Sequence, residues 1–176
     1  RQEYSGEYDQ DALFPVGGKD NFRSVIRQAN EAGIPLSLYT NPILINENTH
    51  RFGAKRGEWG FGYRPVDYGG MMGYVPCLSY QEWVDYMVES WAFLSGDMDA
   101  NIVYLDQLGG GSSICNRTNH PHQSPEPHFY GERVVTRRIR EAIPEDTVIC
   151  SEAHPEDTRL QFQNSFLQGG ILRYIT

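Results

Sequence analysis

Apolar residues occur along this sequence in short continuous runs that alternate with longer stretches of helical periodicity. Three runs, at 34–40, 101–106 and 147–152, have the length and the boundaries of buried β-strands, and a fourth begins at 171–175. Continuous apolar runs, without a polar residue at every second position, are typical of strands whose sheet is covered on both faces. The pattern therefore predicts buried strands at these four places.

Between these runs, apolar residues recur at the spacing of one helix face. We predict helices from Asp20 to Gly33, from Ser79 to about Leu94, over roughly 130–143 and over about 157–168. Asp20 is a candidate N-cap, and Ser79 with Glu82 forms a capping-box pattern. The apolar faces of the first three helices comprise Phe22, Val25, Ile26 and Ala29; then Tyr80, Trp83, Val84, Met87, Trp91 and Leu94; and then Val135, Ile139, Ala142 and Ile143.

The alternation of helices and strands predicts parallel βα units, and two α/β architectures contain them. A doubly wound sheet would place a glycine-rich turn directly between a strand and a helix, but the glycines at 109–111 precede a long polar loop. The strand-to-helix loops at 41–78 and 107–128 are long, whereas the helix-to-strand loops are short. This asymmetry favours a (β/α)8 barrel, whose active site lies in the loops that follow its strands.

A complete barrel of this kind has about 250 residues, and this sequence supplies only about four βα units. We therefore expect residues 1–176 to be a single segment of a (β/α)8 catalytic domain, a partial TIM barrel. The rest of the barrel would belong to a larger parent polypeptide that extends past both ends.

Composition and charge narrow the range of partners. Hydrophobic residues make up 39% and charged residues 22% of the 176 residues, and the net charge is −8. This charge argues against a nucleic-acid partner and against an anionic membrane surface, and it is compatible with a carbohydrate. The three cysteines form no C-x-x-C motif. The sequence leaves the location, secreted or cytoplasmic, and the oligomeric state open.

Polar residues follow the predicted strands at equivalent positions. Asn41, Asp106 and Glu152 each stand at a strand end, and such ends meet at one mouth of a barrel. Two carboxylates in this arrangement are what glycoside hydrolysis requires, one at the anomeric carbon and one at the leaving oxygen. We predict Asp106 and Glu152 as catalytic residues. The neighbouring residues predicted to bind substrate are Asn41, Tyr39, Tyr104, Gln107 and His154.

The two long loops carry further candidates. His120 and His122 could bind sugar hydroxyls or loop backbone, and Trp59 could either stack on a sugar ring or pack the loop onto the barrel. Arg64 could pair with an acidic sugar or a carboxylate. The loop histidines match no zinc-binding motif, so we expect no metal and no cofactor.

The segments 77–83 and 102–109, together with the loop 115–122 and Ser151-Glu152, resemble a poorly characterised group of glycoside-hydrolase-like barrel proteins. That group is distantly similar to endo-α-N-acetylgalactosaminidase and α-amylase barrels. The resemblance implies a retaining glycosidase that cleaves an α-linked glycan, with Asp106 as nucleophile and Glu152 as acid/base. Tyr104 departs from the α-amylase pattern, which has Arg two residues before the nucleophile.

Two alternatives remain open from the residues themselves. One is a metal-assisted hydrolase that uses the loop histidines, and the other is a carbohydrate-binding barrel without catalysis.

Overall fold

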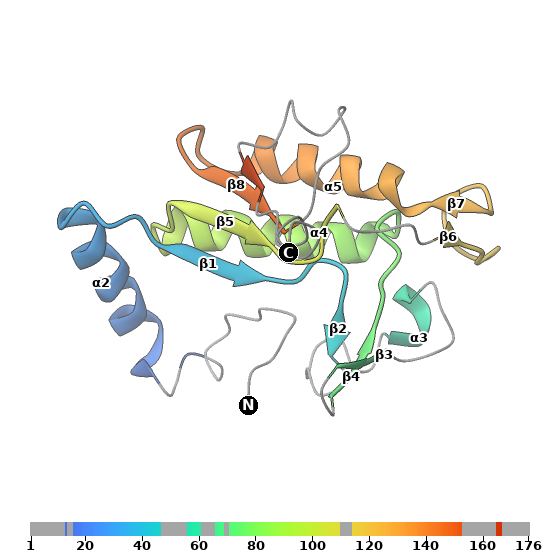
Figure 1. Ribbon diagram of the computed structural model, residues 1–176, viewed down its shortest axis with the longest axis horizontal. Helices are drawn as coiled ribbons and strands as arrows, with labels where there is room; N and C mark the ends of the chain where they lie inside the picture. The colour runs from blue at the N-terminus through green and yellow to red at the C-terminus, as the bar shows by residue number, and fades with distance from the viewer. Residues whose placement is uncertain are drawn as a thin grey trace, which may run out of the picture.

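The computed structural model confirms an α/β organisation with a parallel central sheet (Figure 1). The residues that the structure describes are 13, 16–46, 56–60, 66–68, 71–109, 114–152 and 165–166. Within them, β1 (Ser37–Thr40), β5 (Ile102–Leu105), β8 (Val148–Ser151) and β9 (Ser165–Phe166) form a sheet in this order. All neighbouring strands of the sheet are parallel.

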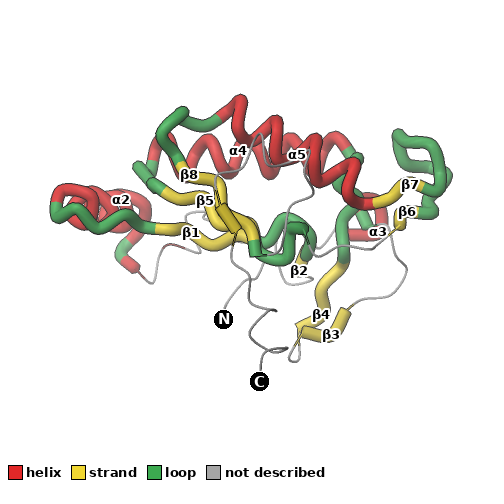
Figure 2. Tube along the Cα trace, turned by 45° about the horizontal axis from the view of Figure 1, so that its top comes forward, coloured by secondary structure: helices red, strands yellow, loops and turns green. Residues whose placement is uncertain are grey.

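The central sheet has two unlike faces because its side chains alternate. Buried residues from β1, β5 and β8 point to one face, where α4 (Gln81–Ala92) and α5 (His128–Ala142) pack side by side (Figure 2). The buried sheet residues on this face are Leu38, Thr40, Val103, Leu105, Ile149 and Ser151. The opposite face carries Tyr39, Tyr104 and Cys150, which are partners in register.

The prediction that Trp83, Met87 and Trp91 are buried is confirmed, since each is at most 1% exposed. They line the core side of α4, which continues as the π-helix η2 (Phe93–Asp97). The predicted capping box is wrong, because α4 begins at Gln81 and no side chain caps it. The Ser79 hydroxyl instead donates to the Glu126 carboxylate, and Glu82 accepts from the Trp59 indole N–H at 3.0 Å.

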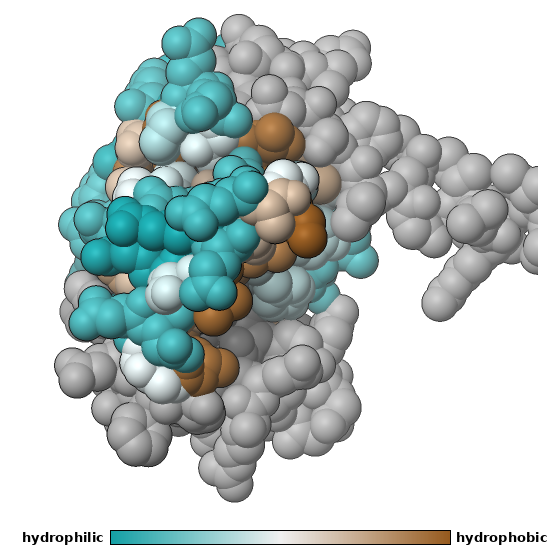
Figure 3. All heavy atoms as spheres, turned by 90° about the vertical axis from the view of Figure 1, so that its left-hand side faces the viewer, coloured by the Kyte–Doolittle hydropathy of each residue, from teal (hydrophilic) through white to brown (hydrophobic). Residues whose placement is uncertain are grey.

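The other predicted helices are confirmed with changes at their ends and faces. Helix α2 (Gly18–Glu31) begins before Asp20, after Gly17 with φ of 87°, and no side chain caps it. Ile26 is buried, whereas Val25 is 51% exposed. Figure 3, which faces the end of the molecule that carries α2, shows a mostly hydrophilic surface there. In α5, Val135 and Ile139 are buried and Ala142 is exposed.

The helix predicted over 157–168 is wrong at its C-terminal end. Ser165 and Phe166 form β9, which pairs in parallel with Cys150 and Ser151. The free edge of β8 offers backbone hydrogen bonds that a local helical pattern does not reveal. The strand predicted at 171–175 lies outside the described residues.

The long loops contain regular structure that the sequence pattern did not predict. The loop 41–78 holds the short helix α3 (Arg56–Trp59) and a small antiparallel sheet of β2 (Ile45–Asn46), β4 (Met71–Tyr74) and β3 (Val66–Tyr68). The loop 107–128 holds the hairpin of β6 (Ile114–Cys115) and β7 (Glu126–Pro127). None of the described helices is long and apolar enough to cross a membrane.

Candidate active site

Three of the predicted site residues follow the central strands at one level. Thr40, Leu105 and Ser151 are partners in register at the ends of β1, β5 and β8, and each is followed by Asn41, Asp106 or Glu152. The hydrogen-bond pattern continues one step further, because the Asp106 N–H donates to Thr40 O at 2.8 Å and the Glu152 N–H to Leu105 O at 3.2 Å. The three residues therefore share one edge of the sheet.

Asp106 is the centre of a hydrogen-bond network on the sheet face opposite α4 and α5. The Tyr39 hydroxyl donates to Asp106 Oδ2 at 2.7 Å, and the Asn41 side-chain amide lies 3.3 Å from the same oxygen. The Tyr104 hydroxyl lies 3.4 Å from Oδ1. Donors on both oxygens fix the orientation of the carboxylate and stabilise its charge.

Tyr104 keeps its hydroxyl proton in this network. The Tyr39 and Tyr104 rings lie side by side with centroids 5.9 Å apart, as expected for register partners on neighbouring strands. Burial raises the pKa of Tyr104 well above its usual range, and the charges of Asp106 and Glu152 raise it further. Tyr104 is therefore a hydrogen-bond donor to Asp106 at neutral pH.

Glu152 lies beside the backbone that follows Asp106. Its Oε2 accepts from the Gln107 N–H at 3.0 Å, and its side chain is otherwise exposed at the edge of the sheet. Gln107 has φ of 59°, a left-handed conformation that turns the chain sharply after the strand. This turn directs the Gln107 N–H toward the neighbouring strand end, so Gln107 holds Glu152 through its main chain.

The buried Asn41 positions the loop after β1. Its side-chain oxygen accepts from the Ile43 N–H at 3.1 Å while its amide faces Asp106. Asn41 is fully buried. Its side-chain oxygen and its side-chain amide nitrogen both have hydrogen-bond partners. Asn41 therefore binds both the backbone of the first long loop and the Asp106 carboxylate.

The remaining predicted residues lie away from this network or outside the described residues. Trp59 is 3% exposed and packs on Trp83 with ring centroids 5.7 Å apart, the packing role considered for the loop aromatics. His120 and His122 of the second long loop gather with Cys115 of the same loop and Cys77 of the first long loop. His154 and Arg64 lie outside the described residues.

A pocket of about 700 Å³ beside α4 does not include the strand-end carboxylates. Trp59, Tyr80, Glu82, Asn119 and His120 are among its lining residues. The second long loop, α3 and α4 therefore line a hollow that is separate from the hydrogen-bond network of Asp106.

Comparison with known proteins finds matches among solved structures alone. No protein-family model matches the chain, and no curated protein matches it. Solved structures do match. An α-N-acetylgalactosaminidase from Bifidobacterium bifidum, solved without ligand, superposes with a TM-score of 0.68 at 13% identity, over 93% of this chain and 27% of that one.

Two further solved glycosidases match in the same way. An α-galactosidase from Thermus thermophilus in complex with stachyose has a TM-score of 0.62 at 18% identity, over 83% of this chain and 30% of its own. A family 31 sulfoquinovosidase from E. rectale has a TM-score of 0.57 at 16% identity, over 88% and 24%.

The chain has a glycoside-hydrolase-like fold. At these identities the likeness concerns the fold and no particular group within it. The chain spans less than a third of each of these solved structures, and within the described residues its central sheet of β1, β5, β8 and β9 is parallel and does not close into a barrel.

Proposed function

We propose that the protein is a retaining glycosidase that acts on an α-linked glycan, with Asp106 as nucleophile and Glu152 as acid/base. The observation that carries the proposal is the network around Asp106. Two tyrosine hydroxyls and one amide face its carboxylate at the end of a central parallel strand. A structural cap would be satisfied by backbone N–H groups, whereas this carboxylate is held by side chains from two strand ends.

Glu152 is our candidate for the second carboxylate. It stands at the equivalent step of the next strand, and the Gln107 N–H holds one of its oxygens. In the proposed reaction Asp106 attacks the anomeric carbon while Glu152 protonates the leaving oxygen. Glu152 then removes a proton from the water that releases the sugar. Retaining geometry predicts carboxyl groups about 5–5.5 Å apart.

The acid/base role is tested with Glu152→Gln. We expect hydrolysis of α-linked oligosaccharides to fall by about 10²–10⁴-fold, because an amide cannot protonate the leaving oxygen. Nitrophenyl α-galactosides and α-N-acetylgalactosaminides should be affected less, since nitrophenolate leaves without protonation. Nuclear magnetic resonance of the first product should show the α-anomer. Glu145→Gln, at an exposed loop position, is the control. A β-anomer, or equal losses for both leaving groups, would contradict the proposal.

Removal of the Tyr39 hydroxyl and removal of the Tyr104 hydroxyl are expected to lower kcat/KM by different factors. Tyr39→Phe removes the 2.7 Å bond to the carboxylate, and a bond to a charged group contributes about 1.5–3 kcal/mol. We expect kcat/KM to fall by about 10–150-fold. Tyr104→Phe removes a 3.4 Å contact and should cost less, which makes it the matched control. Steady-state kinetics of both variants give the comparison, and the reverse order would show that Tyr39 does not position Asp106.

A further inference from the structure

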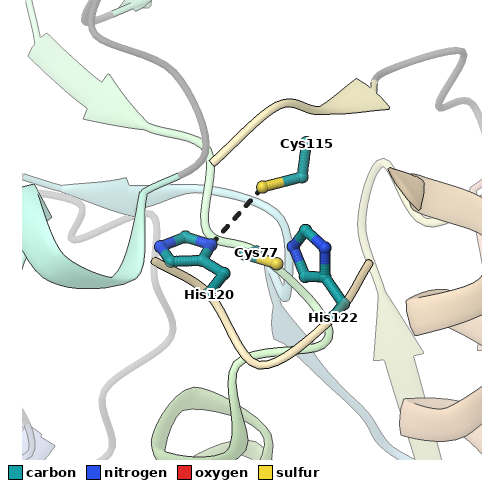
Figure 4. Close-up of side chains that lie close together, drawn as sticks. All are labelled: Cys77, Cys115, His120 and His122. Atoms are coloured by element: carbon teal, nitrogen blue, oxygen red, sulfur yellow. Dashed lines mark hydrogen bonds between the residues drawn. The ribbon is translucent and has the colours of Figure 1, made fainter. Parts of the chain in front are cut away.

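Four metal-binding side chains from the two long loops lie together outside the proposed active site. Cys77, Cys115, His120 and His122 each offer a ligand atom, and these atoms all lie within 4.8 Å of one another. Figure 4 shows the two imidazole rings on either side of the Cys77 sulfur, with Cys115 above it. Cys77 comes from the segment before α4, and the other three come from β6 and the turn that follows. Both cysteines and His120 are buried.

The hydrogen bonds of His120 fix which of its nitrogens faces the cluster. Its Nε2 lies 2.8 Å from the Glu58 carbonyl oxygen, which can only accept, so Nε2 carries the proton. The lone pair is therefore on Nδ1, which lies 3.4 Å from the Cys115 sulfur. A ligating histidine commonly donates its other N–H to a backbone carbonyl in this way, which fixes its tautomer and ring orientation.

His122 has the same arrangement with its nitrogens exchanged. Its Nδ1 lies 3.3 Å from the Gln123 carbonyl oxygen and so carries the proton. Its Nε2 is shielded from solvent and has no hydrogen-bond partner within the described part of the chain. A shielded lone pair without a donor is unfavourable, and a bound cation would satisfy it.

The spacing of the ligand atoms is close to that of a tetrahedral zinc site. Zinc–sulfur bonds of about 2.3 Å and zinc–nitrogen bonds of about 2.0–2.1 Å place neighbouring ligands about 3.3–3.8 Å apart. The Cys115 sulfur and His120 Nδ1 already have this separation. For atoms at the 4.8 Å limit, side-chain shifts of about 1 Å complete the site. Two sulfur and two nitrogen ligands in this geometry are selective for Zn²⁺ over Mg²⁺ or Ca²⁺.

We propose that Cys77, Cys115, His120 and His122 bind one structural Zn²⁺ ion that fastens the two long loops to each other. Four protein ligands close the coordination sphere, so the ion has no open position for substrate or water. Its role is therefore mechanical, and it takes no part in glycoside cleavage.

The structure around the cluster explains why these loops need a metal. Strands β6 and β7 and helix α3 are too short to bury a core of their own, and small elements of this kind are often held by a metal. The cluster reaches two of them: Cys115 belongs to β6, and α3 is bound twice, since the Cys77 N–H donates to Trp59 O at 2.7 Å and His120 to Glu58 O. The ion would join the loop that follows β1 to the loop that follows β5. The first of these loops begins at Asn41, and the second begins directly after Asp106.

The first test is the metal content of the full-length protein, purified under reducing conditions without added metal. We expect elemental analysis to find about one zinc per chain. Cys77→Ser and Cys115→Ser should each lower this content on the order of tenfold. Cys150→Ser is the matched control, because Cys150 is also buried but lies outside the cluster, and it should keep its zinc.

The second test uses the unchanged protein, so it remains informative if the cysteine variants do not fold. Zinc in the unchanged protein is exchanged for Co²⁺, whose visible spectrum reports tetrahedral coordination and thiolate ligation. We expect an intense tetrahedral spectrum with a thiolate charge-transfer band, and a fall in the midpoint of thermal unfolding when a chelator removes the metal. Neither readout depends on glycosidase activity. Absence of zinc together with absence of the cobalt spectrum would overturn the proposal, as would a Cys77–Cys115 disulfide in the mass spectrum of the purified protein.

Discussion

Replacing Asp106 with Asn is expected to lower kcat/KM on α-linked substrates by at least about 10⁴-fold, with little change in stability. The amide keeps the shape of the side chain but is a poor nucleophile, so the covalent glycosyl intermediate cannot form. It also introduces an NH₂ donor into a site built from donors, which face it from Tyr39, Asn41 and Tyr104. Ground-state binding of the sugar should change much less than turnover.

The measurement is steady-state kinetics on α-galactosides and α-N-acetylgalactosaminides, combined with thermal unfolding. Asp99→Asn is the matched control, since Asp99 stands before β5 and forms an exposed ion pair with Arg27. Its φ of 60° is one that Asn tolerates, so activity and fold should persist.

A variant with a cavity at the nucleophile position gives a sharper check. Asp106→Ala with added azide should form a β-glycosyl azide, because the anion attacks from the side that the carboxylate vacated. Full activity of Asp106→Asn would remove this residue from the mechanism. Binding of glycans without any turnover in the unchanged protein would favour the carbohydrate-binding alternative.

Replacing Trp83 with Ala is expected to lower the free energy of unfolding by about 3–5 kcal/mol. Trp83 is fully buried on α4 and packs on Trp59 and Tyr86, with ring centroids 5.7 Å away in each case. Its indole N–H donates to Pro42 O at 2.9 Å. The substitution therefore leaves a large cavity and removes the partner of a carbonyl in the loop after Asn41.

Urea unfolding followed by circular dichroism measures this loss. Trp83→Phe keeps much of the ring packing and should lose less, and it remains informative if the alanine variant does not fold. Tyr130→Ala, at a position 54% exposed, is the control for removal of a ring without creation of a cavity. A loss below about 1 kcal/mol for Trp83→Ala would contradict the placement of this residue in the core.

The proposed zinc site shows why local sequence was a poor guide to metal binding. Within residues 115–122 the histidines and Cys115 match no common zinc motif, and Cys77 lies far from them in sequence. For this reason no metal was expected from the sequence, and a metal-assisted hydrolase was kept only as an alternative. The hairpin of β6 and β7 and the segment before α4 bring the four side chains together only in the folded chain.

Much of the central architecture was determined by the sequence alone. Continuous apolar runs predicted β1, β5 and β8, although β1 and β5 alternate between buried and more exposed residues and only one face of the sheet is covered by α4 and α5. Helical spacing predicted the buried face of α4 through Trp83, Met87 and Trp91. Equivalent positions at the strand ends predicted that Asn41, Asp106 and Glu152 would share one edge, since parallel strands end on the same side.

Only the tertiary structure decided which strand pairs with β8 and which side chains bind Ser79, Glu82 and Asp106. Ser165 and Phe166 pair with the edge of β8 as β9, although their local sequence pattern is helical. Backbone groups that would otherwise be unpaired form hydrogen bonds there. Ser79 and Glu82 match a capping box, but Glu126 and Trp59 bind them instead. Tyr39 and Tyr104 bind the same carboxylate because strand register sets them side by side, and register depends on residues distant in sequence.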